Sequence, residues 1–235
     1  NDPSFAVDDI AISGKRWMPA MIQTAVDTTS GYDEKPVGPF EIVDFYDKFT
    51  GNVLATIADI NGYNWGCVRV EVDRSGIGAQ WVTGDPQTMV QTKLFDKTYK
   101  VTPANNNATG QYNITFYLTQ NEVNGWALAS NNPIPQAKII KYSGRINDMT
   151  YTSNYEQNAA TNINAYLGGQ DYQFSAQFGT GFSGFGFGHI PPGTLPVQIL
   201  SFTARENNKT VDLLWMTENE ENLSHYRVMR SGDGR

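Results

Sequence analysis

The chain has 235 residues, of which 40% are hydrophobic and 17% are charged, so it is long enough for one large domain or two small ones. Lys and Arg number 17 against 24 Asp and Glu, a net charge of −7, which argues against nucleic acid or an anionic membrane surface as the main partner. The sequence has no apolar run of the ~18 residues that a membrane-spanning helix needs, and its single cysteine, Cys67, excludes an internal disulfide framework.

The composition favours strands and tight turns over helices, because aromatic residues and glycine are abundant. In chain order, most apolar segments are short and bounded by Gly, Pro, Asn or Asp, which is typical of strands. Up to residue 188, strands are predicted at 4–13, 40–47, 51–60, 66–76, 97–103, 111–119, 136–146, 163–178 and 182–188. The segment GYDEKPVGPF, residues 31–40, contains two Pro and two Gly and is predicted to be a loop.

The clearest of these strands is GCVRVEVDRSG, residues 66–76. One face carries Val68, Val70 and Val72, and charged residues alternate with them. A period of two indicates a strand with one buried face. Cys67 lies in the same strand and is expected to be a buried small hydrophobe.

The middle of the chain carries two local signals. The Asn-rich segment ANNNATG, residues 104–110, lies between two predicted strands, and it predicts a hairpin because Asn and Gly tolerate positive φ. The segment TQNEVNGW, residues 119–126, is the one predicted helix. Thr119 can cap its start, and Glu122 three residues later completes a capping box.

The best linker signal is HIPPGTLP, residues 189–196, with three Pro and one Gly. The strands before it fit an antiparallel β-sandwich of jelly-roll or immunoglobulin-like type. After it, VQILSFTAREN, NKTVDLLWMTENEEN and HYRVMRS predict three strands of a second β-domain. So short a region rarely buries enough apolar surface to stand alone, so we expect it to pack on the preceding domain or to continue in further chain. The expected fold class is all-β.

The region after the linker resembles the start of a fibronectin type III-like module found near the C-terminus of many secreted Bacteroidetes proteins. The matching residues are Leu195, Pro196, Val197, Leu200, Phe202, Ala204, Trp215, Thr217, Glu220, Asn222, Tyr226, Val228, Arg230, Ser231, Asp233 and Gly234. In such proteins this module is commonly followed by a sorting domain that the type IX secretion machinery recognises. The resemblance implies a piece of a longer protein, secreted or on the outer cell surface. Its implied partners are the upstream and downstream modules and, through a sorting domain outside this chain, the secretion machinery.

Residues 40–190 are similar to a β-sandwich segment that precedes this module in some of the same secreted proteins, including some proteases. The similarity is carried by GNVLATIADINGYNWGCVRVEVDRSG, KTYKVTPANNNATGQYNITFYLTQNEVNGW and FSGFGFG. At the start, DPSFAVDDI resembles the last strand of an upstream jelly-roll or MAM-like module. The predicted parts are therefore the end of that module at 1–12, the β-sandwich at 13–190, the linker at 191–196 and the partial fibronectin type III-like domain at 197–235.

Two sites follow from the resemblance. Jelly-roll modules often hold calcium, a hard ion that takes carboxylate oxygens, so Asp8 and Asp9 are candidate ligands. Adjacent strand residues point to opposite faces, so only one of the two would usually reach the ion, and a solvated strand end is the alternative. Secreted Bacteroidetes proteins are often O-glycosylated at the hydroxyl after Asp, which makes Thr28 in VDTTSG a candidate; the alternative is a polar turn. No cofactor other than calcium is expected.

Aromatic residues supply the candidate ligand contacts. The segment NGYNWGC places Tyr63 and Trp65 among Gly and Asn. Exposed aromatics on β-sandwiches stack on sugar rings or anchor protein partners, so these two residues are candidate contacts for a glycan or another surface ligand. Trp81 and Trp126 are candidates of the same kind. The alternative is that Trp65 closes one end of the core.

The segment GTGFSG, residues 179–184, has the spacing G-x-G-x-x-G. A dinucleotide site needs this pattern to open a helix, and the following FGFGHIPPG cannot begin one. We expect a strand instead, with Phe182, Phe185 and Phe187 packed in the core.

Catalytic groups are scarce. The two histidines, His189 and His225, fall in the predicted linker and the second domain, and no Ser or Cys nucleophile has an evident partner. We therefore expect a non-catalytic accessory or spacer region that holds an upstream functional domain, such as a hydrolase or adhesin, away from the cell-surface attachment point. One alternative is a glycan- or surface-ligand-binding module. A second is part of a secreted hydrolase, because two carboxylates on separate strands could cleave a glycoside.

Overall fold

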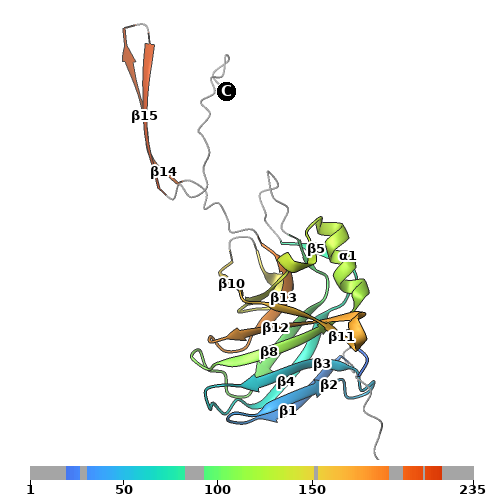
Figure 1. Cartoon of the computed structure of the whole chain (residues 1–235). Helices are drawn as coiled ribbons and strands as arrows, with labels where there is room; N and C mark the ends of the chain where they lie inside the picture. The colour runs from blue at the N-terminus through green and yellow to red at the C-terminus, as the bar shows by residue number, and fades with distance from the viewer. Residues whose placement is uncertain are drawn as a thin grey trace, which may run out of the picture. The chain divides into compact units, whose positions relative to one another are not determined.

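The computed structural model describes residues 20–26, 31–82, 93–150, 153–190, 198–208 and 210–218. The chain divides into two compact units, Asn1–His189 and Ile190–Arg235. In the described residues the first unit consists mainly of two antiparallel sheets packed together, so the predicted all-β sandwich class is confirmed (Figure 1). No helix in this described part of the chain has the length and hydropathy of a membrane-spanning segment.

One sheet of the sandwich has eight strands, and each pairs antiparallel with its neighbours. The order is β1-β4-β7-β13-β6-β5, while β9 pairs with β13 and carries β10 on its other side. The bounds are β1 Tyr32–Val37, β4 Gly66–Arg74, β5 Ala79–Trp81, β6 Lys93–Phe95, β7 Thr98–Pro103, β9 Lys138–Tyr142, β10 Tyr155–Gln157 and β13 Gly184–His189.

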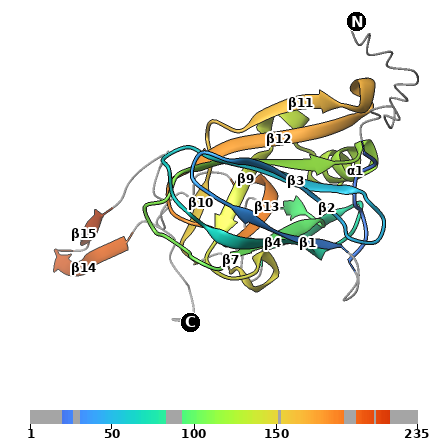
Figure 2. The same ribbon diagram turned by 90° about the horizontal axis from the view of Figure 1, so that it is seen from below.

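The other sheet has five strands in the order β11-β12-β8-β3-β2, again antiparallel. Its bounds are β2 Ile42–Tyr46, β3 Val53–Asp59, β8 Tyr112–Leu118, β11 Asn162–Tyr166 and β12 Asp171–Phe178. The helical segments are α1 Gln120–Ser130, η1 Ile134–Gln136, η2 Ile146–Asp148 and η3 Leu167–Gly169. Figure 2 shows the two sheets as separate layers.

An aromatic core fills the space between these layers. Phe116 of β8 is fully buried, and its ring centroid lies 5.2 Å from that of Phe185 and 5.4 Å from that of Phe187 in the opposite sheet. Phe182, just before β13, is buried as well. The expectation that GTGFSG leads into a core strand is therefore confirmed, and in the described residues no helix follows it.

Strand β4 confirms one prediction and corrects another. Val68, Val70 and Val72 are buried, as their spacing predicts. Cys67, however, is exposed, and its thiol lies 3.3 Å from the Glu34 carboxylate. The prediction of a buried thiol was wrong because the same period of two that buries the valines turns the residue before Val68 outward.

The predicted loop at residues 31–40 was also wrong over most of its length, because β1 occupies Tyr32–Val37. Strand β1 lies at one end of the eight-stranded sheet and pairs only with β4 there. Pro36 stands opposite Cys67 in this pair. An edge strand tolerates proline because one side of its backbone has no ladder partner that needs an N–H.

The predicted hairpin at ANNNATG is not formed, because β7 belongs to the eight-stranded sheet and β8 to the five-stranded one. The Asn-rich connection crosses between the layers. Its polar groups bond to other segments: the Asn105 N–H donates to the Trp65 carbonyl at 3.0 Å, and the Asn106 side chain binds the Phe182 backbone. The asparagines therefore tie the crossover to its neighbours instead of forming a two-strand turn.

The predicted helix is confirmed as α1, and it extends to Ser130. Its capping box is present: Thr119 Oγ1 accepts from the Glu122 N–H at 3.3 Å, and Glu122 Oε2 accepts from the Thr119 N–H at 2.7 Å. Lys97 Nζ lies 3.2 Å from Glu122 Oε1, and the two side chains are 0% and 2% exposed. The start of the helix is thus joined to the core by a buried ion pair.

The described part of the second unit is a pair of antiparallel strands, β14 Gln198–Asn207 and β15 Thr210–Glu218, where two strands were predicted. Several large apolar side chains on these strands are exposed: Leu200, Phe202, Val211, Leu214 and Met216. The third predicted strand, HYRVMRS, lies outside the described residues. The fibronectin type III-like character of this unit stays a prediction.

Candidate functional site

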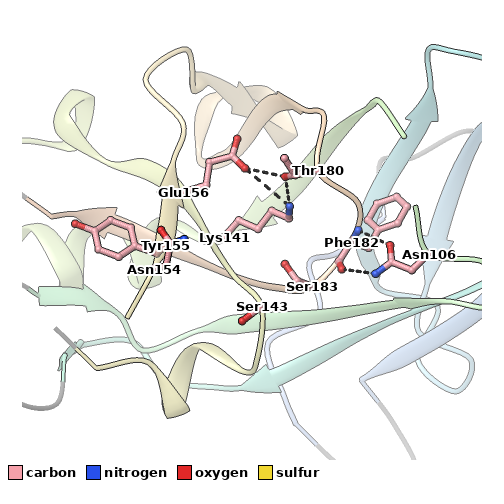
Figure 3. Close-up of a pocket in the computed structure, with 9 residues that line it drawn as sticks. All are labelled: Asn106, Lys141, Ser143, Asn154, Tyr155, Glu156, Thr180, Phe182 and Ser183. Atoms are coloured by element: carbon pink, nitrogen blue, oxygen red, sulfur yellow. Dashed lines mark hydrogen bonds and ion pairs between the residues drawn. The ribbon is translucent and has the colours of Figure 1, made fainter. Parts of the chain in front are cut away.

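A polar pocket lies at the edge of the eight-stranded sheet, beside β9, β10 and the segment that enters β13. Its volume is about 350 Å³. Small-molecule sites in proteins start at about this size. The lining residues are Asn106, Lys141, Ser143, Asn154, Tyr155, Glu156, Thr180, Phe182 and Ser183 (Figure 3).

Strand register brings the charged pair of the pocket together. Lys141 of β9 stands directly opposite Glu156 of β10, and side chains at opposed positions of an antiparallel pair project to the same face. Lys141 Nζ lies 3.8 Å from Glu156 Oε2. The ammonium also donates to Thr180 Oγ1, and that hydroxyl donates to Glu156 Oε2 at 2.9 Å. Figure 3 shows these three side chains meeting at one side of the pocket.

The Lys141 ammonium is held in a poorly solvated place. Its residue is only 7% exposed, and Nζ lies 5.8 Å from the centre of the Phe178 ring. Burial lowers the pKa of Lys141, and the Glu156 carboxylate opposes that shift without cancelling it. An ammonium that has lost water gains more from each new hydrogen-bond acceptor than an exposed one does.

The opposite wall of the pocket is fixed by Asn106 from the crossover between the sheets. Asn106 Oδ1 accepts from the Phe182 N–H at 2.9 Å, and its Nδ2 donates to the Phe182 carbonyl at 3.0 Å. Gly181, next to this clasp, has φ +75°, and a Cβ there would lie 2.7 Å from Asn106 Oδ1. Glycine at 181 therefore permits the close approach of Asn106, which holds the backbone of Phe182 next to Ser183.

Ser183 carries the feature that points to a ligand. The residue is 7% exposed, and its hydroxyl oxygen is buried with no hydrogen-bond partner among the described residues. Buried polar groups are nearly always paired, because an unpaired one loses its bonds to water without replacement. A buried hydroxyl without a partner in the lining of a polar pocket is a group that a ligand can satisfy.

The predicted contact Trp65 does not face this or any other open site. Its side chain is fully buried, its indole N–H donates to Asp59 Oδ1 at 3.0 Å, and its ring packs against those of Tyr63, Tyr112 and Phe182. A buried ring offers no face to a sugar, so the ligand role predicted for Trp65 is corrected and the core-closing alternative fits. Tyr63 is half-buried against it.

The other predicted residues are spread over the molecule. Trp126 is buried and stacks on Phe95 with ring centroids 4.7 Å apart, whereas Trp81 is 48% exposed, with the Lys93 ammonium 4.4 Å from its ring centre. His189 ends strand β13 and does not lie in a linker. The remaining candidates lie outside the described residues: Asp8, Asp9, Thr28, His225 and linker residues 191–196. Within the described part of the chain, no three His, Cys, Asp or Glu side chains are grouped as a metal site would require.

Sequence reasoning missed the pocket itself. Lys141, Glu156, Thr180 and Ser183 share no spacing, because register between β9 and β10 and a crossover from the other sheet bring them together. The one local signal is the glycine-rich turn before β13, and that pattern predicts a core strand without indicating a pocket. No protein-family model, curated protein or solved structure matches this chain. The resemblance to secreted Bacteroidetes proteins therefore stays a prediction.

Proposed function

We propose that the sandwich is a non-catalytic accessory module that binds a neutral, hydroxyl-rich ligand, such as the end of a glycan, in the pocket beside β9 and β10. The observation that carries the proposal is the buried, unpartnered hydroxyl of Ser183 at the pocket wall. A sugar hydroxyl both donates and accepts, so it can pair with such a group in either direction.

The charges of the pocket support a neutral ligand. Lys141 and Glu156 are the charged residues of the lining, and their charges cancel. Lys141 offers ammonium donors, while Glu156, whose side chain is 41% exposed, offers acceptor oxygens toward solvent. A ligand with alternating donors and acceptors fits this wall better than an anion, which the carboxylate repels.

The proposed setting is a secreted or surface-attached bacterial protein exported by type IX secretion, as the C-terminal sequence pattern suggests. A spacer role between modules is compatible with ligand binding and is supported by the division of the chain at His189. In this view the module holds an upstream domain near a surface glycan instead of acting on the glycan itself.

The test is a glycan array probed with the whole 235-residue chain, followed by calorimetry on the best ligand. Ser183→Ala removes an unpaired hydroxyl, so the free energy of unfolding should be unchanged or higher while affinity falls about five- to tenfold, the value of one hydrogen bond. Lys141→Met should weaken binding similarly.

The matched control is Lys48→Met, which removes an exposed ammonium on the connection between β2 and β3, away from the pocket lining. It should bind like the wild type. The proposal fails if no glycan is retained by the wild-type chain, or if Ser183→Ala and Lys141→Met both bind with wild-type affinity.

A further inference from the structure

A second surface carries tyrosines that the pocket does not use. It is the outer face of the five-stranded sheet, the face turned away from the core (Figures 1 and 2). Side chains alternate along β8, so that Phe116 and Leu118 are buried while Tyr117 between them faces outward and is half-buried. Tyr46 of β2 and Tyr166 of β11 are half-buried as well.

The three tyrosines form one cluster. The ring centroids of Tyr117 and Tyr166 are 4.8 Å apart at an interplanar angle of 56°. Burial comes first among the causes that raise the pKa of each of the three phenols, and the nearby Asp44 carboxylate also contributes in every case. Tyr46 follows Asp44 by two residues on β2, and Thr56 Oγ1 bonds both Asp44 and the Tyr117 hydroxyl, so Tyr46 lies near Tyr117.

The hydroxyl groups of two of these rings are tethered. The Tyr117 hydroxyl is 2.9 Å from Thr56 Oγ1, and the Tyr166 hydroxyl donates to the Ala20 carbonyl at 2.9 Å. Thr56 Oγ1 in turn donates to Asp44 Oδ1 at 2.6 Å. Rings held in this way lose little freedom when a ligand stacks on them, which favours binding.

A row of polar side chains crosses the sheet next to the cluster. The register of the five strands aligns one residue from each: Asn162, Ser175, Thr115, Thr56 and Asp44. Thr115 Oγ1 lies 2.8 Å from Ser175 Oγ. Neighbouring strands are about 4.8 Å apart, so the row spans roughly 19 Å, the length of a chain of several sugars.

We propose that this outer face binds an extended, neutral polysaccharide, with Tyr46, Tyr117 and Tyr166 stacking on sugar rings beside the row of hydroxyl and amide groups. The row itself contains one carboxylate and no Lys or Arg. The Lys35 ammonium, which lies 5.2 Å from the centre of the Tyr46 ring, is paired with Asp33 Oδ2 at 2.8 Å, so it adds little attraction for an anionic chain. A protein partner would need a largely apolar centre at the interface, whereas this row consists of hydroxyl, amide and carboxylate groups. The site is separate from the Ser183 pocket, and neither proposal depends on the other.

The test is affinity electrophoresis of the full chain in gels that contain neutral xylan, galactomannan or β-glucan, with polygalacturonate as the anionic comparison. A neutral polysaccharide should retard the wild type. Tyr166→Ala and Tyr117→Ala should each lower the affinity about two- to tenfold, the range of one aromatic stacking contact. Tyr166→Phe should keep most of the retardation, because it keeps the ring.

The controls distinguish loss of binding at this surface from loss of folding and from binding in the Ser183 pocket. Tyr32→Ala removes a half-buried tyrosine from β1 of the other sheet and should leave retardation unchanged. Ser183→Ala should also leave it unchanged. Urea unfolding identifies any variant that fails to fold, and Tyr166, on the edge strand β11, is then the deciding position. The proposal is overturned if no neutral polysaccharide retards the wild type, if folded Tyr166→Ala runs like the wild type, or if polygalacturonate retards more strongly.

Discussion

Replacing Lys97 by methionine tests the buried ion pair at the start of α1. The change keeps the side-chain volume and leaves the Glu122 carboxylate in a site where it is 2% exposed. Removing one partner of a buried pair costs ~3–5 kcal/mol of unfolding free energy. The lower end applies here, because both partners of Lys97 retain another hydrogen bond. Glu122 Oε2 still accepts from the Thr119 N–H. The Tyr117 carbonyl, which accepts from Lys97 in the wild type, still accepts from the Tyr99 hydroxyl at 3.0 Å. We expect a loss of about 3 kcal/mol.

The measurement is urea unfolding at pH 7, followed by tryptophan fluorescence and completed as a double-mutant cycle. Adding Glu122→Gln to Lys97→Met removes the unpaired charge and keeps a capping oxygen, so it should recover at least about 1.5 kcal/mol. Lys48→Met, at an exposed site, should change stability by less than about 0.5 kcal/mol. A loss below about 1 kcal/mol for Lys97→Met, or strictly additive effects in the cycle, would refute the reasoning.

Three further outcomes are expected. Burial would raise the pKa of Asp47, but hydrogen bonds from a hydroxyl and nearby backbone N–H groups outweigh burial, and the pKa is lowered. The ionised carboxylate therefore contributes to stability above about pH 4, and this contribution is lost below that pH. The urea midpoint of the wild type should fall more steeply between about pH 5 and pH 3 than that of Asp47→Asn. Gly125→Ala should destabilise the protein, because the added Cβ would clash with the Ile77 carbonyl. Without that clash, alanine would favour the helix by about 1 kcal/mol over glycine. The direction of the change in the thermal unfolding midpoint tests this expectation. Cys67 is exposed, so a thiol reagent should modify it in the native protein. The reaction at pH 8.5 should be slower than that of free cysteine, because the hydrogen bond to Glu34 raises the pKa of the thiol. Protection of the thiol until denaturant is added would contradict its exposed position.

Local signals predicted the elements whose chemistry is local. The valine alternation of β4 and the capping box of Thr119 and Glu122 lie within a few residues, and both are confirmed. The loop prediction at 31–40 failed because Pro36 breaks a central strand but not an edge strand, and position within a sheet is not written in a single segment. The hairpin prediction failed for the same kind of reason: asparagine permits a turn, but it does not determine which sheet the next strand joins.

The candidate site could not be predicted from the sequence, because its residues come from separate segments of the chain. Lys141 and Glu156 meet through strand register, and Ser183 is placed by a clasp from Asn106, 77 positions earlier in the chain. Trp65 was a wrong choice for an exposed aromatic contact, because its side chain is buried in the core. The tyrosines of the outer sheet face lie in ordinary alternating strands, and their grouping depends on the order of five strands.

The position of β13 has a consequence for how the molecule assembles. It is the last strand of the first unit in sequence, yet it lies inside the eight-stranded sheet, with β9 on one side and β7 and β6 on the other. Until residues 184–189 are in place, those strands have no common neighbour and the core lacks Phe185 and Phe187. Closing the sandwich therefore depends on contacts between strands far apart in the sequence, and topologies rich in such contacts fold slowly. A chain in which β13 is unpaired exposes strand edges that other chains can bind.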